Sequence, residues 1–226
     1  MSTLIVPICG KSERYGLNDP KWSLKIRGEL MLTASLKYMI WQKLVFGVKS
    51  VHAKLVPWFP FSDFEKSPFG LVVFEKQTQS QIETIRDIIT TWKVTGPIQI
   101  KDCDNQFEPR AITIEDHNKN FIAYSRLQGV IFNPESKSYL ELNENNEIVN
   151  VVEKKIISDK FCCGLYGFES VEDFMYYSQG CSYVSEVVFK MILDKKVFTG
   201  MSVEKYEDWG TLEAFQYYNK LGQDNG

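Results

Sequence analysis

The first apolar segment of the chain constrains its fold more than any other part. Leu4 to Cys9 is a short apolar run that ends in Gly10, and this pattern is typical of a buried strand bounded by a turn. In an open α/β sheet, the loop after the first strand lies at the carboxyl ends of the strands, where such sheets bind their ligands. The segment therefore predicts an α/β fold with a ligand site directly after the first strand.

The loop that follows this strand carries the groups that a polyphosphate requires. Gly10 allows backbone N–H groups to approach an anion closely. Hydrogen-bond donors and positive charge come from four side chains: Lys11, Ser12, Arg14 and Lys21. The P-loop pattern is not matched, because Ile5 stands where its first glycine belongs, and the dinucleotide-binding pattern lacks its second glycine. An ordinary surface turn with solvated charges is the alternative.

The composition is that of a soluble globular protein, with 44% hydrophobic and 24% charged residues. A net charge of −3 provides no bulk attraction to nucleic acid or to an anionic membrane, so a phosphate site must be a local cluster. No apolar run approaches the length of a membrane span, and the first strand begins without a preceding signal peptide. We therefore expect a cytoplasmic protein.

The cysteines and histidines restrict the metal chemistry that is open to the chain. Its 5 cysteines, an odd number, contain no C-x-x-C pair, which favours reduced thiols packed as small hydrophobic side chains. The histidines, His52 and His117, are not spaced as zinc ligands. A metal bound here should be a hard cation on carboxylates.

Such carboxylates follow the strand that we predict over residues 98–100. Asp102 and Asp104 stand at its carboxyl end, and because positions i and i+2 of a strand share a face, both can point at one site. Two acids there can hold Mg²⁺ through oxygen. The alternative is a solvated turn, where Asp and Asn are common. The buried strand before these acids and the phosphate-binding groups upstream favour the metal.

A second polar turn lies between a strand predicted over 71–75 and a helix predicted over 80–92. If the sheet is parallel, this turn lies near the first loop, and Gln77, Gln79 and Ser80 can read the edge of a nucleobase. A simple helix cap by Thr78 or Ser80 explains the same residues equally well. The aromatic, proline-broken segment 57–64 indicates irregular structure packed on the core, with a lid or an oligomer interface as alternatives.

The remaining periodicities alternate strands with helices in the first half and give hairpins in the second. We expect helices over 31–44 and 184–193, and a last helix that ends at 221. Strands are expected over 48–56, 121–127, 161–168 and 197–206, with a hairpin of 138–142 and 148–152. This order indicates an α/β architecture with a mixed sheet.

Taken in order, these segments resemble the sugar-phosphate nucleotidyltransferases of the GT-A-like superfamily, of the NDP-sugar pyrophosphorylase and cytidylyltransferase type. The resemblance rests on short motifs that span positions 5 to 211: Gly10, Arg14 and Pro20-Lys21; Asp104-Asn105; Glu153-Lys154; Gly164-Leu-Tyr166-Gly-Phe168; and Asp208-Trp-Gly210-Thr211. Each motif is weak alone, but together and in this order they are specific. Two departures stand out: Ser12 replaces the second glycine of the loop, and the second half has no room for an added helical or acyltransferase domain.

The resemblance implies a Rossmann-like three-layer α/β/α fold with a mixed, mostly parallel central sheet. It implies a single domain over 1–226, in which residues 1–110 bind the nucleotide and 111–226 the acceptor. The implied reaction is attack by a phosphate oxygen of the acceptor on the α-phosphorus of an NTP, with pyrophosphate leaving. The implied partners are an NTP and a small phosphorylated acceptor. Neither a nucleic acid nor a membrane is implied as a partner, and assembly into a homo-oligomer is left open.

The resemblance also implies roles for individual residues. Catalysis would depend on Arg14, Lys21, Asp104 and Asp208, and the implied cofactor, Mg²⁺, would be held by Asp104 and Asp208. The nucleotide would contact Ile8, Gly10, Lys11, Ser12, Gln77, Gln79, Ser80 and Asp102. The acceptor would contact Glu153, Lys154, Gly164 and Glu186.

The identity of the substrates is less constrained. Residues 80–84 slightly resemble the base loop of small cytidylyltransferases. This resemblance weakly favours CTP as the nucleotide substrate. The first acceptor to consider is a sugar 1-phosphate, with choline phosphate, another alcohol phosphate or an amino-acid phosphate as alternatives. The product would then serve the synthesis of capsule, other surface polysaccharide or glycoconjugate precursors.

Two other functions stay open. A GT-A glycosyltransferase would use Asp102-Cys103-Asp104 as its D-x-D motif and consume an NDP-sugar. A non-catalytic nucleotide-binding module would keep the fold without the chemistry. The early cations favour a triphosphate user, because a diphosphate-sugar user does not need them, and the two acids Asp104 and Asp208 disfavour a mere binder.

Overall fold

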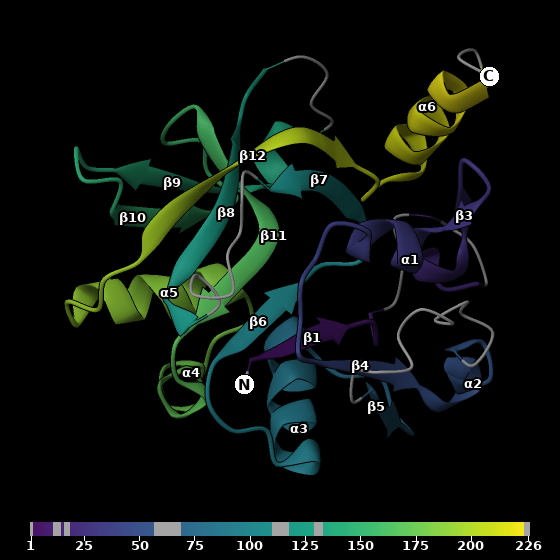
Figure 1. Ribbon diagram of the computed structural model, residues 1–226, viewed down its shortest axis with the longest axis horizontal. Helices are drawn as coiled ribbons and strands as arrows, with labels where there is room; N and C mark the ends of the chain where they lie inside the picture. Colours follow the sequence, from purple (N-terminus) through teal and green to yellow (C-terminus); the bar gives the residue numbers. More distant parts are fainter. Residues whose placement is uncertain are drawn as a thin grey trace.

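The computed structural model describes residues 2–10, 15, 19–56, 69–109, 118–128 and 133–223. A ten-stranded sheet runs through it in the order β5-β4-β1-β6-β11-β8-β12-β7, with β9 and β10 attached beside β11 (Figure 1). Its strands are β1 Thr3–Pro7, β4 Lys43–Lys49, β5 Phe69–Phe74, β6 Ile98–Lys101, β7 Asn105–Pro109, β8 Phe121–Arg126, β9 Ser138–Leu142, β10 Ile148–Glu153, β11 Lys160–Phe168 and β12 Thr199–Asp208. A second sheet pairs β2 (Lys25–Ile26) with β3 (Glu29–Leu30).

The directions of the strands make the large sheet mixed. β5, β4, β1 and β6 pair in parallel, and so do β8 and β12. β11 is antiparallel to both β6 and β8, so the two parallel groups that it joins point the same way. β7 ends the sheet antiparallel to β12. The predicted mixed, mostly parallel sheet is confirmed.

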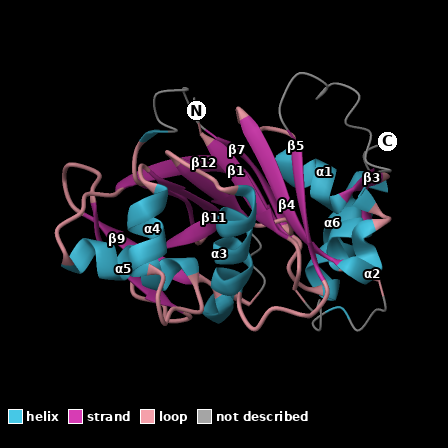
Figure 2. Cartoon of the chain, turned by 90° about the horizontal axis from the view of Figure 1, so that it is seen from below, coloured by secondary structure: helices cyan, strands magenta, loops and turns pink. Residues whose placement is uncertain are grey.

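Helices cover the sheet on two faces. They are α1 Met31–Leu36, α2 Ser50–Ala53, α3 Gln81–Trp92, α4 Val171–Tyr177, α5 Val184–Leu193 and α6 Leu212–Gln223, together with the 3-10 helices η2 Lys21–Ser23 and η5 Pro134–Ser136. Figure 2 shows α3, α4 and α5 side by side along one face of the sheet. No described helix is long and apolar enough to cross a membrane.

Alternating side chains of the parallel strands build a separate core on each face. Ile5 and Val45 belong to the core that contains α3, α4 and α5. Their neighbours Leu4 and Phe46 point the other way, into the core that contains α1. The central strands are therefore buried on both faces, as is typical of parallel strands covered by helices on each side.

Two predictions for the first half of the chain are wrong. The helix expected over 31–44 ends at Leu36, and the strand expected over 48–56 is β4 followed by the short helix α2. All residues from Leu44 to Val48 are buried, which suits a central strand better than an amphipathic helix. Gly47 belongs to this strand, and a Cβ there would lie 2.6 Å from Ile88 Cδ1, because α3 packs directly on the backbone.

The other predicted helices and strands are confirmed, most within two residues of their expected ends. No sequence pattern pointed to β7 or α4, which the structure adds. The predicted aromatic segment 57–64 lies outside the described residues. All five cysteines are free thiols, as expected.

Candidate active site

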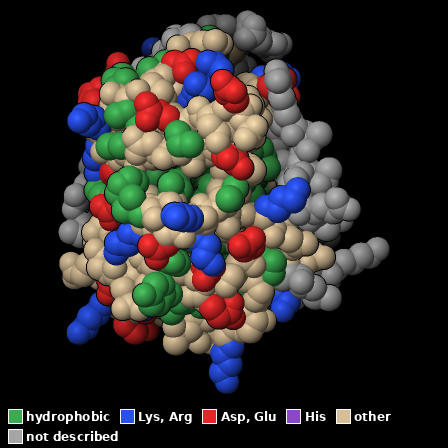
Figure 3. All heavy atoms as spheres, turned by 90° about the vertical axis from the view of Figure 1, so that its left-hand side faces the viewer, with side chains coloured by type: hydrophobic (Ala, Val, Ile, Leu, Met, Phe, Trp, Pro, Cys, Tyr) green, Lys and Arg blue, Asp and Glu red, His purple; other side chains and the backbone are tan. Residues whose placement is uncertain are grey.

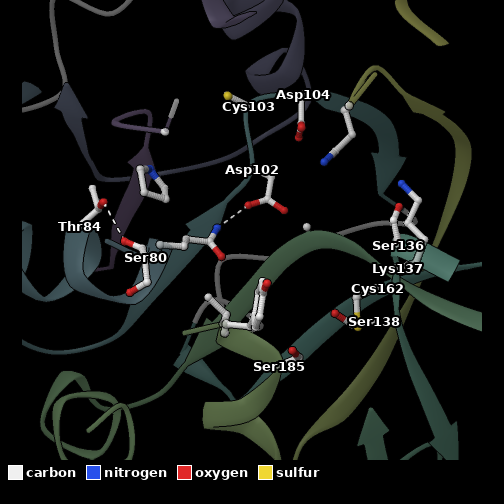
Figure 4. A pocket seen from close by; sticks show the side chains of 18 of the residues that line it. Ser80, Thr84, Asp102, Cys103, Asp104, Ser136, Lys137, Ser138, Cys162 and Ser185 are labelled. Carbon is white, nitrogen blue, oxygen red and sulfur yellow. Dashed lines mark hydrogen bonds between the residues drawn. The ribbon is translucent and has the colours of Figure 1, made fainter. Parts of the chain in front are cut away.

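A cavity of about 670 Å³ opens at the carboxyl ends of β1 and β6. Residues from both halves of the chain line it, including Gly10, Lys21, Asp104, Glu153 and Asp208. Figure 4 shows side chains from the β6–β7 loop, the start of α3 and the β9 region converging on it. This is the place where the sequence predicts a ligand.

Strand pairing brings the two predicted metal-binding acids together. Asp104 immediately precedes β7, and β7 pairs with β12 so that Asn105 lies opposite Asp208. The N–H of Trp209 donates to the Asp104 carbonyl at 2.7 Å and fixes this register. A Cβ on Gly210 would lie 3.0 Å from Asp208 Oδ1 and 3.3 Å from Asp104 Oδ2. The two carboxylates therefore face one small space that glycine keeps open.

Each of these acids is paired with a lysine. Lys21 Nζ lies 2.5 Å from Asp104 Oδ2, and Lys137 Nζ donates to Asp208 Oδ2. Burial alone would raise the pKa of Asp104, but Lys21 outweighs it and holds this pKa well below its usual range. Burial likewise opposes the charge of Lys21, and Asp104 nevertheless raises the Lys21 pKa above its usual value. The Lys21–Asp104 pair is thus charged at neutral pH.

Asp102 faces the same cavity and is held by helix α3. Its Oδ1 accepts a hydrogen bond of 2.6 Å from Gln81 Nε2 (Figure 4). Burial and the neighbouring charge of Asp104 raise the pKa of Asp102 to about 6. Gly164 lies directly against it, with φ +71°, and a Cβ there would overlap Asp102 Oδ2. The predicted site residue Gly164 therefore makes room for this carboxylate.

A buried lysine supports the acidic loop from behind. Lys101 is fully buried, and its ammonium donates to the carbonyls of Asp102 (2.7 Å) and Asn105 (3.2 Å) and to Asn105 Oδ1 (2.6 Å). Burial lowers the pKa of Lys101 to about 8. These hydrogen bonds clamp the backbone on both sides of Asp104.

The described residues predicted to bind the nucleotide line the cavity: Ile8, Gly10, Gln77, Gln79, Ser80 and Asp102. Ser80 also caps α3, since its Oγ accepts from Glu83 N at 3.1 Å, so the prediction of a helix cap is confirmed for this residue. Gln77 donates to the carbonyl of Cys9 and ties this turn to the first strand. Three predicted residues, Lys11, Ser12 and Arg14, lie outside the described residues.

Of the residues predicted to bind the acceptor, Glu153 and Lys154 line the cavity and Glu186 does not. Glu153 Oε2 accepts hydrogen bonds from Ser138 and from Ser185, the latter at 2.6 Å. The Lys154 ammonium binds the Tyr183 hydroxyl and lies 4.1 Å from the centre of that ring. Glu186 instead accepts from the N–H groups of Ser182 (2.7 Å) and Tyr183 (3.1 Å), which caps the start of α5.

Several cavity residues were missed by the sequence analysis: Gln81, Lys137, Ser138, Ser185 and Tyr206. Gln81 belongs to the polar turn before α3 and could have been included with its neighbours. Lys137 stands between two serines just before β9 and matches no motif. The one sequence signal for Lys137 was its position directly before a strand of the predicted hairpin.

The donor set fits one hard cation. Among the described residues, no group of three or more His, Cys, Asp or Glu side chains forms a metal cluster. Mg²⁺ does not require one, because it is commonly held by one or two carboxylates, substrate phosphates and water. Asp104 and Asp208 supply two carboxylates across a shared space.

The fold around this cavity is shared with solved NDP-sugar pyrophosphorylases and a CTP transferase. The chain matches a nucleoside-diphosphate-sugar pyrophosphorylase from Vibrio cholerae at 16% identity, over 96% of this chain and 99% of that one, with a TM-score of 0.81. It matches a UDP-glucose pyrophosphorylase complexed with UDP-glucose at 14% identity, over 100% of each chain, with a TM-score of 0.81. The inositol-1-phosphate CTP transferase from T. maritima gives 15% identity over 98% and 94%, and a TM-score of 0.72.

The predicted resemblance in fold is therefore confirmed over nearly the whole chain. No protein-family model matches the chain, and no curated protein is detectably similar to it in sequence. Since one fold can support different activities, the activity has to be argued from the site.

Proposed function

We propose that this chain is a nucleotidyltransferase that joins an NTP to a phosphorylated acceptor and releases pyrophosphate. The observation that carries the proposal is the pair of acids, Asp104 and Asp208, which face one space and each bind a lysine. Carboxylates for one hard cation, beside two ammonium groups, are what a polyphosphate substrate requires. The likeness in fold to an inositol-1-phosphate CTP transferase and to a UDP-glucose pyrophosphorylase supports the same conclusion.

The reaction needs positioning and charge neutralisation more than covalent chemistry. An oxygen of the acceptor phosphate forms a bond to the α-phosphorus, the bond to the bridging oxygen breaks, and pyrophosphate leaves with its electron pair. Mg²⁺ held by Asp104 and Asp208 would neutralise phosphate charge and align the reacting groups. Lys21 would stabilise the charge that develops at the α-phosphate, and Arg14 and Lys11 the departing pyrophosphate.

The residues that line the cavity indicate which nucleotide and which acceptor should be tested first. Gln77, Gln79 and Ser80 would read the base, and we propose CTP as the first nucleotide to test. Glu153, held by two serines, would accept hydrogen bonds from the body of the acceptor, for which a sugar 1-phosphate is the first choice. The product would be an NDP-linked precursor for capsule or another glycoconjugate, made in the cytoplasm.

Product analysis tests the proposal. The purified chain is incubated with Mg²⁺, each of CTP, UTP, dTTP, GTP and ATP, and a panel of sugar 1-phosphates, choline phosphate and other small phosphates. We expect pyrophosphate and a nucleotide-linked product from at least one pair. Turnover of an NDP-sugar onto a hydroxyl acceptor, without pyrophosphate, would instead identify a glycosyltransferase that uses Asp102 and Asp104.

Two variants test the acids directly. Asp104→Asn and Asp208→Asn should each lower turnover at least about 100-fold, because each removes a charge that the transition state needs. Asp159→Asn is the matched control, since Asp159 also binds a basic side chain, Arg126, but lies at the surface with 49% of its side chain exposed. Circular dichroism checks the fold, and unchanged turnover in either site variant would remove that acid from the mechanism.

A further inference from the structure

Lys137 binds one of the two acids, but the mechanism above assigns it no step of its own. Lys137 directly precedes β9, and its side chain is only 12% exposed. Its ammonium binds Asp208 Oδ2 and the Tyr206 hydroxyl, the latter at 3.2 Å, and lies 5.5 Å from the centre of the Tyr206 ring. The carboxylate of Asp208 is the acidic partner of Lys137 among these contacts.

The place of Lys137 in the chain links the two parts of the cavity. Lys137 reaches Asp208, at the acid pair, while the next residue, Ser138, donates to Glu153 on the acceptor side. One short segment at the start of β9 therefore touches both the acid pair and the acceptor region (Figure 4). An attacking phosphate must lie between these two regions, joined to the acceptor body on one side and aimed at the α-phosphorus on the other.

We propose that Lys137 is the residue that binds the phosphate group of the acceptor. This inference rests on the proposed function and deepens it. Lys137 and Lys21 form two similar lysine–aspartate pairs, one at each acid, so each half of the chain contributes a cation. Lys21 serves the nucleotide and Lys137 serves the nucleophile. Charge-assisted hydrogen bonds from an ammonium to phosphate are stronger than neutral ones.

Lys154, the lysine that the resemblance implied for the acceptor, has a different setting. Its backbone is left-handed, with φ +54°, and its ammonium lies over the Tyr183 ring and binds the Tyr183 hydroxyl. It belongs to the cavity wall formed with the start of α5 rather than to the acid pair. Lys154 is thus the alternative candidate for binding the acceptor phosphate, and a test of Lys137 has to include it.

The test compares Lys137→Met, Lys137→Arg and Lys154→Met. Removing the Lys137 charge should raise the KM for the phosphorylated acceptor about 10- to 100-fold, as expected for a lost charge-assisted hydrogen bond. The Kd for Mg²⁺–NTP, measured by calorimetry without acceptor, should change less than about threefold, and Lys137→Arg should recover part of the loss. Lys196→Met is the matched control, because Lys196 binds Asp173 at 2.7 Å away from the cavity.

The opposite pattern would overturn the inference: an unchanged acceptor KM in Lys137→Met, or a rise confined to Lys154→Met. A rise in the NTP Kd as large as the rise in KM would also overturn it, because Lys137 would then serve the metal site. If the Met variant fails to fold by circular dichroism, Lys137→Gln takes its place.

A binding measurement separates this inference from the proposed function. Calorimetry measures the binding of glucose 1-phosphate, glycerol 3-phosphate, choline phosphate and inorganic phosphate in the presence of Mg²⁺. Weaker binding of the best of these probes to Lys137→Met, with no change in Lys196→Met, supports the phosphate site even if no pyrophosphate is ever released. No binding to the unmodified chain, or equal binding to Lys137→Met, rejects the phosphate site while pyrophosphate release still decides the proposed function.

Discussion

At the scale of single residues, glycines decide how much room the acids have. Gly164 combines a left-handed backbone with close packing, since a Cβ would overlap Asp102 Oδ2 and lie 2.8 Å from Asn105 Nδ2. Gly180 has nearly the same backbone, with φ +73°, but faces open space. The two positions thus separate the cost of the conformation from the cost of contact with the acidic loop.

Alanine at these glycines should therefore have unequal effects. Gly180→Ala should lower the free energy of unfolding by about 1 kcal/mol, the cost of a left-handed non-glycine residue. Gly164→Ala should lower it by at least about 1 kcal/mol more, because overpacking of this kind typically costs about 1–3 kcal/mol. Urea unfolding of both variants measures the difference. Equal losses in the free energy of unfolding would show that the loop carrying Asp102 moves aside without cost.

Single-residue signals also set the limit of what the sequence could predict at the site. Asp104, Asp208 and Glu153 stand in motifs, and the structure places all three in one cavity. Lys137 could not be found, because its partner Asp208 is distant in sequence and a lysine between serines is common on surfaces. Glu186 was assigned to the acceptor, whereas its carboxylate caps the start of α5.

At the scale of secondary structure, helix α3 connects packing with the proposed base site. Its start is capped by Ser80, whose carbonyl also accepts from Thr84 Oγ1 at 3.2 Å. Helix α4 has an equivalent cap, in which Ser170 Oγ accepts from Asp173 N at 3.1 Å, but it lies away from the cavity.

Removing either serine cap should lower the stability of the protein by a similar amount. Only removal of the Ser80 cap should also weaken the binding of the nucleotide. Ser80→Ala and Ser170→Ala should each lower the free energy of unfolding by about 1 kcal/mol. Ser80→Ala should in addition weaken NTP binding severalfold, because the turn with Gln77 and Gln79 loses its anchor. Calorimetric Kd values for both variants check this, and equal NTP affinity in the two would confine Ser80 to a structural role.

Elements with a clear periodicity were predicted correctly, and α5 has the expected limits of 184–193. The helix predicted over 31–44 was wrong, because Leu32, Leu36 and Leu44 fit a helical spacing by chance. Burial of both faces of β4 removes the polar alternation that would have identified a strand there. β7 was missed because its pairing with β12, far along the chain, decides its conformation.

At the scale of the whole molecule, the predicted halves 1–110 and 111–226 share one sheet. β11, from the second half, pairs with β6 of the first half, and β7 of the first half pairs with β12 of the second. Acidic and basic side chains are interspersed over the face near β9, β10 and α5 (Figure 3). That distribution offers no single-sign surface there for a nucleic acid.

The continuous sheet predicts one cooperative unit. Thermal unfolding followed by far-UV circular dichroism and by tryptophan fluorescence should give coincident single transitions. A fragment of residues 1–110 should remain unfolded, because β7 would lose its partner and β6 one of its neighbours. Two separate transitions, or a folded fragment, would favour two independent domains. Mg²⁺–NTP should raise the transition temperature of the full chain by mass action.

The pairing of β7 with β12 also has a consequence for synthesis in the cell. Asp104 acquires its companion carboxylate only after residue 208 has emerged from the ribosome. A nascent or prematurely terminated polypeptide, however well its early strands assemble, lacks half of the acid pair. On the proposed mechanism, such a product could hold a nucleotide but could not consume it.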